Sequence, residues 1–132
     1  MLRTVTVLIF AATVIALAGC SSGSGYSDLD RDATSTDVLP SDLPAYASED
    51  HVEGSVRLVG EFEGVEYYLL RKDDFADICV VVYRSAVDWI GGCGGPNGSF
   101  GISGSGLDIF VAPDGSPILE DGTKVGANIV VR

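Results

Sequence analysis

The sequence predicts an all-β fold for residues 51–132, either a small antiparallel barrel or a two-layer sandwich. Runs of four to seven residues rich in Val, Ile, Leu and Tyr recur roughly every ten residues, with Gly, Asp, Asn or Pro between them. Both faces of the run Ile78–Tyr83 are apolar, which indicates a central strand that is covered on each side. The expected strands are Val56–Phe62, Val65–Arg71, Ile78–Tyr83, Asp88–Cys93, Ser99–Ile102, Leu107–Val111 and Val125–Val131.

The breaks between these runs have the chemistry of turns. Glu63-Gly64 predicts a tight hairpin turn, because Gly supplies a positive φ without steric cost. A strict two-residue loop would place Glu61 opposite Glu66, where the two charges repel, and a three-residue loop with a bulge would avoid that pair. Further polar or glycine-rich breaks lie at 72–74, 96–98, 103–106, 113–115 and 121–122.

Two cysteines are expected to form a disulfide across the hairpin 78–93. If Tyr83 faces Trp89 across the loop, then Cys79 faces Cys93 on the same side of the sheet. Directly opposed Cβ atoms lie about 4.5–5.5 Å apart, close to what a disulfide requires. A redox role is the alternative, but catalytic dithiols usually form Cys-x-x-Cys at a helix start, and here the two cysteines lie in expected strands.

The first 19 residues read as a signal peptide, with Arg3 near the start and an apolar run from Val5 to Ala18. This run is shorter than the roughly 20 residues of a spanning helix. The string Leu-Ala-Gly-Cys that ends at Cys20 resembles a bacterial lipoprotein box. The resemblance implies lipidation of Cys20, cleavage before it and anchoring to the extracytoplasmic face of the cell membrane by two or three acyl chains. A secreted protein with an incidental Cys20 is the alternative.

Residues 20–50 are expected to form a lipidated, disordered acidic tether. Ser, Gly, Asp, Thr, Ala and Pro dominate the stretch, and no period of 2 or 3.6 is sustained. Asp28, Asp30 and Asp32 alternate like the start of an EF-hand loop, but Ala33 stands where that loop needs Gly and Leu39 where it needs Glu. A solvated linker is therefore preferred to a calcium site.

The charge balance excludes one class of partner. The chain has 8 basic and 19 acidic residues, a formal −11. Removal of residues 1–19 would take away Arg3 and no acid, leaving 7 basic and 19 acidic residues, a formal −12. Nucleic-acid binding needs a basic face, so no nucleic-acid partner is expected.

No catalytic, metal or cofactor site is expected. The glycine-rich stretch 91–106 lacks the Gly-Lys-Ser/Thr ending of a phosphate loop. His51 is the only imidazole and stands at the edge of the expected tether. The acids Asp73, Asp74 and Asp77 cluster in one loop, where a solvated loop is preferred to a hydrolytic pair.

Three aromatic residues are candidates for a recognition surface. Tyr67 and Tyr68 are neighbours on one expected strand, so one of them must face away from the core. Trp89 lies on the second strand of the cysteine hairpin. If any of them is exposed beside other apolar groups, that patch would recognise a partner.

The order of these features resembles small uncharacterised lipoproteins of actinobacteria. The resemblance covers residues 55–112 and lies in the segment VRLVGEFEGVEYYLLR, a Cys-Val-Val-Val strand and a Trp…Cys-Gly-Gly segment. It implies an extracytoplasmic location and a β-rich domain, and it brings no activity with it. We therefore expect a non-enzymatic domain, anchored to the membrane at Cys20, that binds an envelope protein or ligand. The alternatives are a small envelope hydrolase using loop carboxylates and a surface cation-binding protein.

Overall fold

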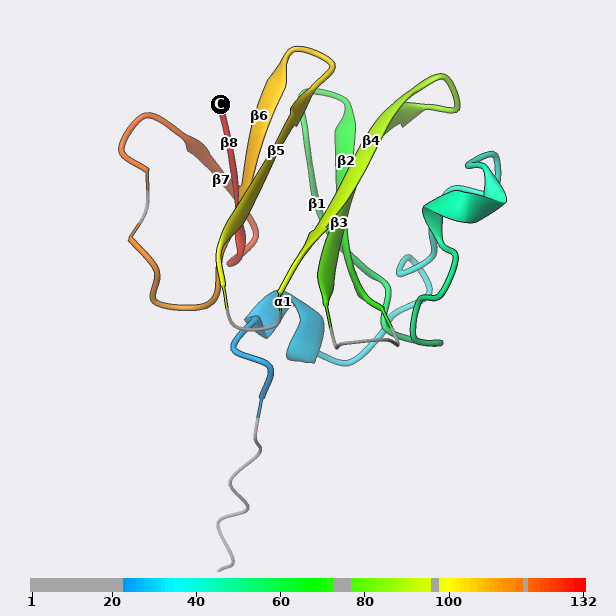
Figure 1. Cartoon of the computed structure of the whole chain (residues 1–132), viewed down its shortest axis with the longest axis horizontal. Helices are drawn as coiled ribbons and strands as arrows, with labels where there is room; N and C mark the ends of the chain where they lie inside the picture. Colours follow the sequence, from blue (N-terminus) through cyan, green and yellow to red (C-terminus); the bar gives the residue numbers. More distant parts are fainter. Residues whose placement is uncertain (1–22, 73–76, 96–97, 118) are drawn as a thin grey trace, which may run out of the picture.

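The computed structural model describes residues 23–72, 77–95, 98–117 and 119–132. They form two antiparallel sheets of four strands each, which face one another and are not closed into a barrel (Figure 1). The expected all-β class is confirmed, and of the two architectures the sandwich is the one observed. Within the described ranges, no helix is long and apolar enough to cross a membrane.

The first sheet has the order β1-β2-β3-β4 and the second has the order β5-β6-β8-β7. The strands of the first sheet are β1 Arg57–Phe62, β2 Val65–Arg71, β3 Ile78–Ser85 and β4 Asp88–Gly94. Those of the second are β5 Phe100–Gly104, β6 Leu107–Val111, β7 Thr123–Val125 and β8 Ile129–Val131. Two short helices precede them, α1 Ser27–Asp30 and the 3₁₀-helix η1 Ala45–Ala47.

The final expected strand, Val125–Val131, is wrong as a single element. The structure divides it into β7 and β8, which pair with each other around a turn. Gly126 adopts a φ of 63° there, and buried Asn128 donates to the carbonyl of Ala112 at 3.0 Å. This turn adds an edge strand that periodicity alone did not reveal.

The cysteine hairpin has the expected register. Tyr83 lies opposite Trp89 and Cys79 opposite Cys93, and the two cysteines are joined by a disulfide with Cα atoms 4.0 Å apart. The bond closes the strand pair at the end distant from the β3–β4 turn.

The β1–β2 turn takes the strict two-residue form, so the three-residue alternative is wrong. Glu63 and Gly64 have φ values of 52° and 75°, as a type I′ turn requires. Glu61 consequently lies opposite Glu66, and the hydroxyl of Tyr68 donates to the Glu66 carboxylate at 2.8 Å. This hydrogen bond offsets part of the repulsion between the two glutamates.

The main core lies between the two sheets. It is built from the inward-facing residues of both sheets and from two residues of the chain before β1. Its buried members are Tyr26, Leu29, Val65, Tyr67, Leu69, Ile78, Val80, Val82, Ile109, Val111, Val125, Ile129 and Val131.

Glycines allow β4 of the first sheet and β5 of the second to lie close to each other. A Cβ on Gly92 would lie 2.5 Å from Cγ2 of Ile102, and one on Gly104 would lie 2.9 Å from Cγ2 of Ile90. A Cβ on Gly94 would likewise meet the ring of Phe100. The glycine-rich stretch therefore serves packing between strands, in keeping with the structural interpretation of its composition.

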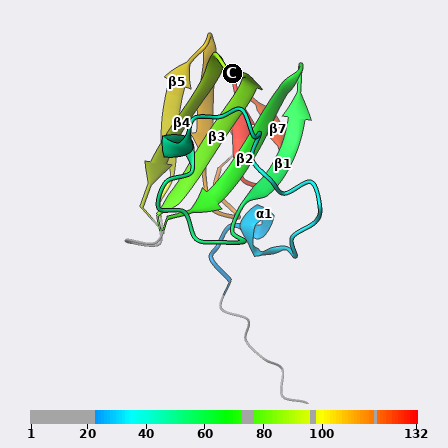
Figure 2. The same ribbon diagram turned by 90° about the vertical axis from the view of Figure 1, so that its right-hand side faces the viewer.

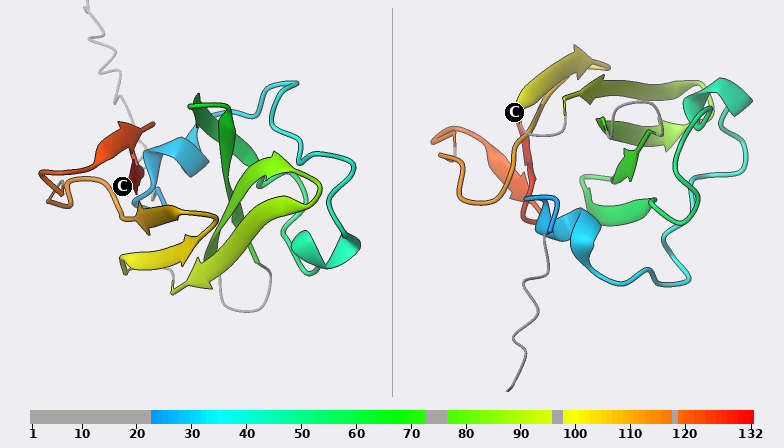
Figure 3. Two further views of the ribbon diagram at one scale, coloured as in Figure 1. Left: turned by 90° about the horizontal axis from the view of Figure 1, so that it is seen from above. Right: turned by 60° about the horizontal axis from the view of Figure 1, so that its bottom comes forward.

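The N-terminal segment, residues 23–50, departs from the expected disordered tether. Tyr26 is 0% exposed, and its hydroxyl donates to the carbonyl of Gly98 at 2.7 Å. Helix α1 closes one end of the sandwich (Figure 3), and the rest of the segment runs across the outer face of the first sheet (Figure 2). The packed domain therefore begins well before residue 51.

A second apolar cluster lies under this segment. Its buried members are Val56, Tyr68, Leu70, Cys79 and Val81, with Leu39 and Leu43 of the N-terminal segment packed against them. Both faces of β2 and β3 are thus covered, as the apolar pattern of Ile78–Tyr83 predicted.

Candidate functional site

An open groove lies on the outer face of the first sheet, between η1 and β4. Its volume is about 220 Å³. We call it the aromatic groove, and its lining residues are Tyr46, Ala47, Lys72, Val80, Val81, Trp89, Gly91, Gly92 and Cys93. The N-terminal segment covers the outer face of the first sheet, and the groove lies where this cover ends.

Two aromatic rings form one wall. The ring centroids of Tyr46 and Trp89 lie 5.7 Å apart, and the planes are inclined by 42°. Tyr46 is 66% exposed, which is unusual for a residue of this size, whereas Trp89 is half-buried. The pair therefore presents aromatic surface to solvent from two segments that are distant in the sequence.

The hairpin register explains the position of Trp89. It lies opposite Tyr83, and both pack against the second apolar cluster on the outer face. Two residues further along β4, Gly91 leaves the floor flat, since a Cβ there would lie 3.5 Å from Cζ3 of Trp89. A ligand can consequently approach the strand itself beside the indole ring.

The N-terminal segment, which supplies Tyr46 to the groove, is fastened to β3 by a hydrogen bond. The hydroxyl of Tyr83 donates to both carboxylate oxygens of Asp42, at 3.0 and 2.9 Å. This hydrogen bond raises the pKa of Tyr83 above its ordinary value. Lys72 adds a cation among the lining residues. The groove thus combines apolar surface with one positive charge.

Tyr67 and Tyr68, candidates for a recognition surface if exposed, are both buried. Tyr67 lies in the main core and Tyr68 in the second cluster, and burial raises the pKa of both hydroxyls. The main core holds the face of β2 that carries Tyr67, and the N-terminal segment covers the face that carries Tyr68. Of the three candidates, Trp89 borders the aromatic groove, and its partner Tyr46 lies in the segment expected to be a tether.

Several other candidates lie outside the described residues or have structural partners. Cys20, Asp73 and Asp74 fall outside the described ranges. His51 forms an isolated bridge with Lys72 at the end of β2, and its Nδ1 is hydrogen-bonded to the carbonyl of Ser48. This is the position of an edge histidine that fastens the chain.

The aspartates of the EF-hand-like stretch bind the protein's own backbone. Asp28 accepts from the amides of Ala127 and Asn128, both at 2.8 Å. Asp30 accepts from the amide of Ser24 at 2.8 Å and faces Arg71 at 3.5 Å. Across the part of the chain that the structure describes, no group of three or more His, Cys, Asp or Glu residues could hold a metal ion.

A second uncovered surface lies on the outer face of the other sheet. Phe110 is 37% exposed and borders a groove of about 200 Å³ that also includes Lys124 and Val130. It provides an exposed aromatic residue on the opposite sheet, which makes it a suitable control site.

Comparison of the chain with protein-family models, with curated proteins and with solved structures found no match in any of the three.

Proposed function

We propose that the chain is a lipid-anchored extracytoplasmic protein whose sandwich domain binds a partner at the cell envelope without catalysing a reaction. The lipoprotein-box resemblance at Cys20 supports the anchor. The Cys79–Cys93 disulfide fits the oxidising environment outside the membrane. The partner is an envelope protein or another component of the envelope.

The aromatic groove is the observation that carries the binding function. Tyrosine and tryptophan side chains are over-represented among the residues that dominate binding energy, because they bury a large area at an interface. Tyr46 and Trp89 supply such area, and the glycine floor lets a ligand contact both the ring and the strand. The wall and the floor come from different segments, which the Tyr46–Trp89 ring contact and the Tyr83–Asp42 hydrogen bond hold together.

A retention experiment with groove variants tests the proposal. The mature chain is immobilised and exposed to solubilised envelope, and the retained material is quantified for the wild type, Trp89→Ala and Gly91→Ala. Trp89→Ala removes one of the two rings of the wall, and Gly91→Ala places a methyl group on the floor at an ordinary contact distance of 3.5 Å from the indole. We expect both variants to lose most of the retained material.

Phe110→Ala provides the matched control, because it removes an exposed aromatic residue from the other sheet. It should retain as much material as the wild type. A wild-type protein that retains nothing above the empty support, or groove variants that retain as much as the wild type, would count against the proposal.

A further inference from the structure

We infer that the anchored domain lies directly on the bilayer, with the α1 end against the lipid headgroups and the hairpin turns facing away. The inference rests on the proposed lipidation of Cys20. It specifies which end of the domain contacts the membrane and which end is offered to partners. It also replaces the long tether that the sequence suggested with a very short one.

The packed part of the chain begins close to Cys20. The amide of Ser24 donates to the Asp30 carboxylate at 2.8 Å, and Tyr26 is fully buried in the main core. Ser27 donates through its amide and its hydroxyl to Asp114, at 3.1 and 2.9 Å. These contacts fix the start of the chain to the rest of the domain.

The length of chain between the anchor and this point limits how far the domain can stand from the bilayer. Cys20 precedes Ser24 by four residues, and a fully extended chain spans at most about 3.3–3.6 Å per residue. The Cα of Ser24 must therefore stay within about 14 Å of the Cα of the lipidated Cys20. That distance is too short for another protein domain to fit between this end and the headgroups.

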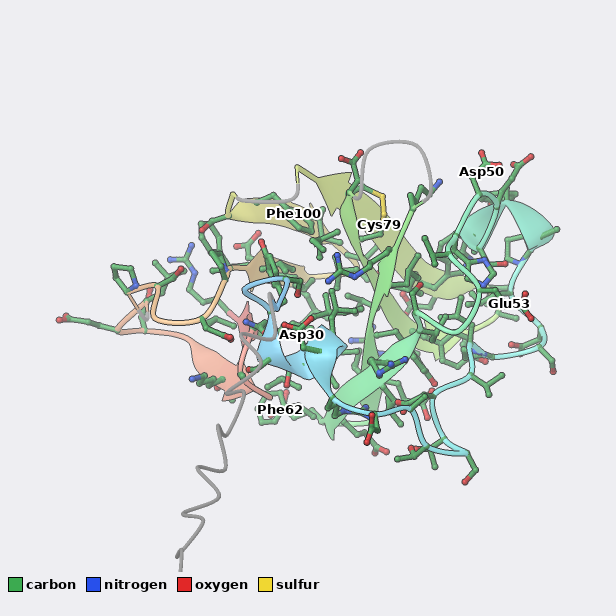
Figure 4. All side chains as sticks on the ribbon, turned by 90° about the horizontal axis from the view of Figure 1, so that it is seen from below. Asp30, Asp50, Glu53, Phe62, Cys79 and Phe100 are labelled. Carbon is green, nitrogen blue, oxygen red and sulfur yellow. A yellow bond between two sulfur atoms is a disulfide. The ribbon has the colours of Figure 1, made fainter. Side chains whose placement is uncertain are left out.

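The fold places the hairpin turns at the opposite end. Figure 1 shows α1 at one end of the sandwich and the β1–β2, β3–β4 and β5–β6 turns at the other. Figure 4 looks directly at the α1 end, with Asp30 near the middle of the view. Val87, in the β3–β4 turn, is 96% exposed and would point away from the bilayer.

The charge distribution favours this upright orientation. The chain from Cys20 onward carries 19 acidic and 7 basic residues, so laying a side of the domain on an anionic membrane is unfavourable. At the α1 end, the carboxylates of Asp28 and Asp114 are turned toward the chain and accept its own hydrogen bonds. Asp30 faces Arg71. These hydrogen bonds hold Asp28 and Asp114 against the chain, and Arg71 compensates the charge of Asp30.

Site-specific fluorescence quenching tests the orientation. Full-length protein is purified from membranes and reconstituted into phosphatidylethanolamine–phosphatidylglycerol vesicles that contain a lipid with a nitroxide headgroup. A thiol-reactive fluorophore is attached to Ala33→Cys, three residues after α1, or to Val87→Cys at the far turn; both positions are exposed. We expect quenching to be several-fold greater at position 33 than at position 87. Equal quenching, or stronger quenching at position 87, would overturn the orientation.

A variant with a longer linker distinguishes the effect of the short anchor from any affinity of the domain surface for lipid. An insertion of about 20 Gly and Ser residues after Ser22 adds a mean reach of about 25 Å. Quenching at position 33 should then fall toward the value at position 87, and unchanged quenching would overturn the inference. Measurement of the intact mass of the same preparation distinguishes the proposed lipid anchor from the proposed orientation. A missing diacylglyceryl group refutes the anchor. Lipidated protein with equal quenching at the two positions refutes only the orientation.

Discussion

Single polar residues decide how the N-terminal segment is attached. Asp37 has a side chain that is 1% exposed, and its carboxylate accepts two hydrogen bonds from Arg31, both at 2.7 Å. The amides of Thr34 and Leu58 each donate to it at 2.7 Å. The contact with Leu58 joins the segment to β1, so one carboxylate connects two parts of the chain that composition analysis had assigned to separate regions.

The first prediction concerns this carboxylate. The Arg31 hydrogen bonds hold the pKa of Asp37 well below its usual range. Its stabilising contribution is therefore complete above the unfolded-state pKa of about 3.9 and is lost as the pH falls below that value. Asp37→Asn should lower the free energy of unfolding by about 2 kcal/mol at pH 7.

Urea unfolding of both proteins between pH 7 and pH 3 checks this prediction. The difference between wild type and Asp37→Asn should be constant down to about pH 5 and then shrink on acidification. A difference that stays the same to pH 3 would show that the ionised carboxylate is not what stabilises the attachment.

The second prediction uses two adjacent glycines as a matched pair. Gly92→Ala places a Cβ 2.5 Å from Ile102 between the sheets, whereas Gly91→Ala makes only ordinary contacts on the outer face. We expect Gly92→Ala to cost about 1–3 kcal/mol and Gly91→Ala to stay within about 0.5 kcal/mol of the wild type. Denaturation midpoints measure both, and equal effects would refute the close approach of β4 and β5.

At the scale of elements, the β3–β4 hairpin was the most predictable part of the chain. Its register follows from local spacing, because one alignment pairs both the aromatic residues and the cysteines. The split between β7 and β8 was not predictable in this way. It depends on Asn128, whose side-chain oxygen accepts from the amide of Asp28 at 3.0 Å, a contact across 100 residues that no local pattern encodes.

The third prediction concerns the disulfide of this hairpin. Replacing both Cys79 and Cys93 with Ala should lower the free energy of unfolding by roughly 3 kcal/mol, the chain-entropy value for a loop of about 15 residues. Reduction of the wild-type protein should have a similar effect. Calorimetric or urea unfolding that shows no change would mean that the bond does not constrain the unfolded chain.

At the scale of the whole molecule, the N-terminal segment belongs to the sandwich. Its apolar residues are isolated by Ser, Thr, Asp and Pro, so no window of the sequence shows a strand or helix period. Four of its apolar residues nevertheless pack against the sheets: Tyr26 and Leu29 in the main core, and Leu39 and Leu43 on the second cluster. The composition of a segment indicates how much of it is buried on average. It does not reveal a segment that a few side chains attach to the domain. The aromatic groove was hidden for the same reason, because Tyr46 lies in that segment.

The fourth prediction tests this assignment with two tyrosines of the same segment. Tyr26 is 0% exposed and Tyr46 is 66% exposed. Tyr26→Ala should cost about 3–5 kcal/mol of stability, whereas Tyr46→Ala should cost less than about 1 kcal/mol. Thermal and urea unfolding provide the comparison. If neither substitution changes stability, the segment is a free tether after all.

The account depends most on the anchor at Cys20, because the location, the orientation and the kind of partner all follow from it. Mass spectrometry of the protein extracted from the membrane fraction of its own host tests it most directly. The account predicts a mature chain that begins at Cys20 and carries a thioether-linked diacylglyceryl group, with Cys79 and Cys93 linked to each other. A chain that retains residues 1–19, or one that begins elsewhere with no lipid on Cys20, would contradict it.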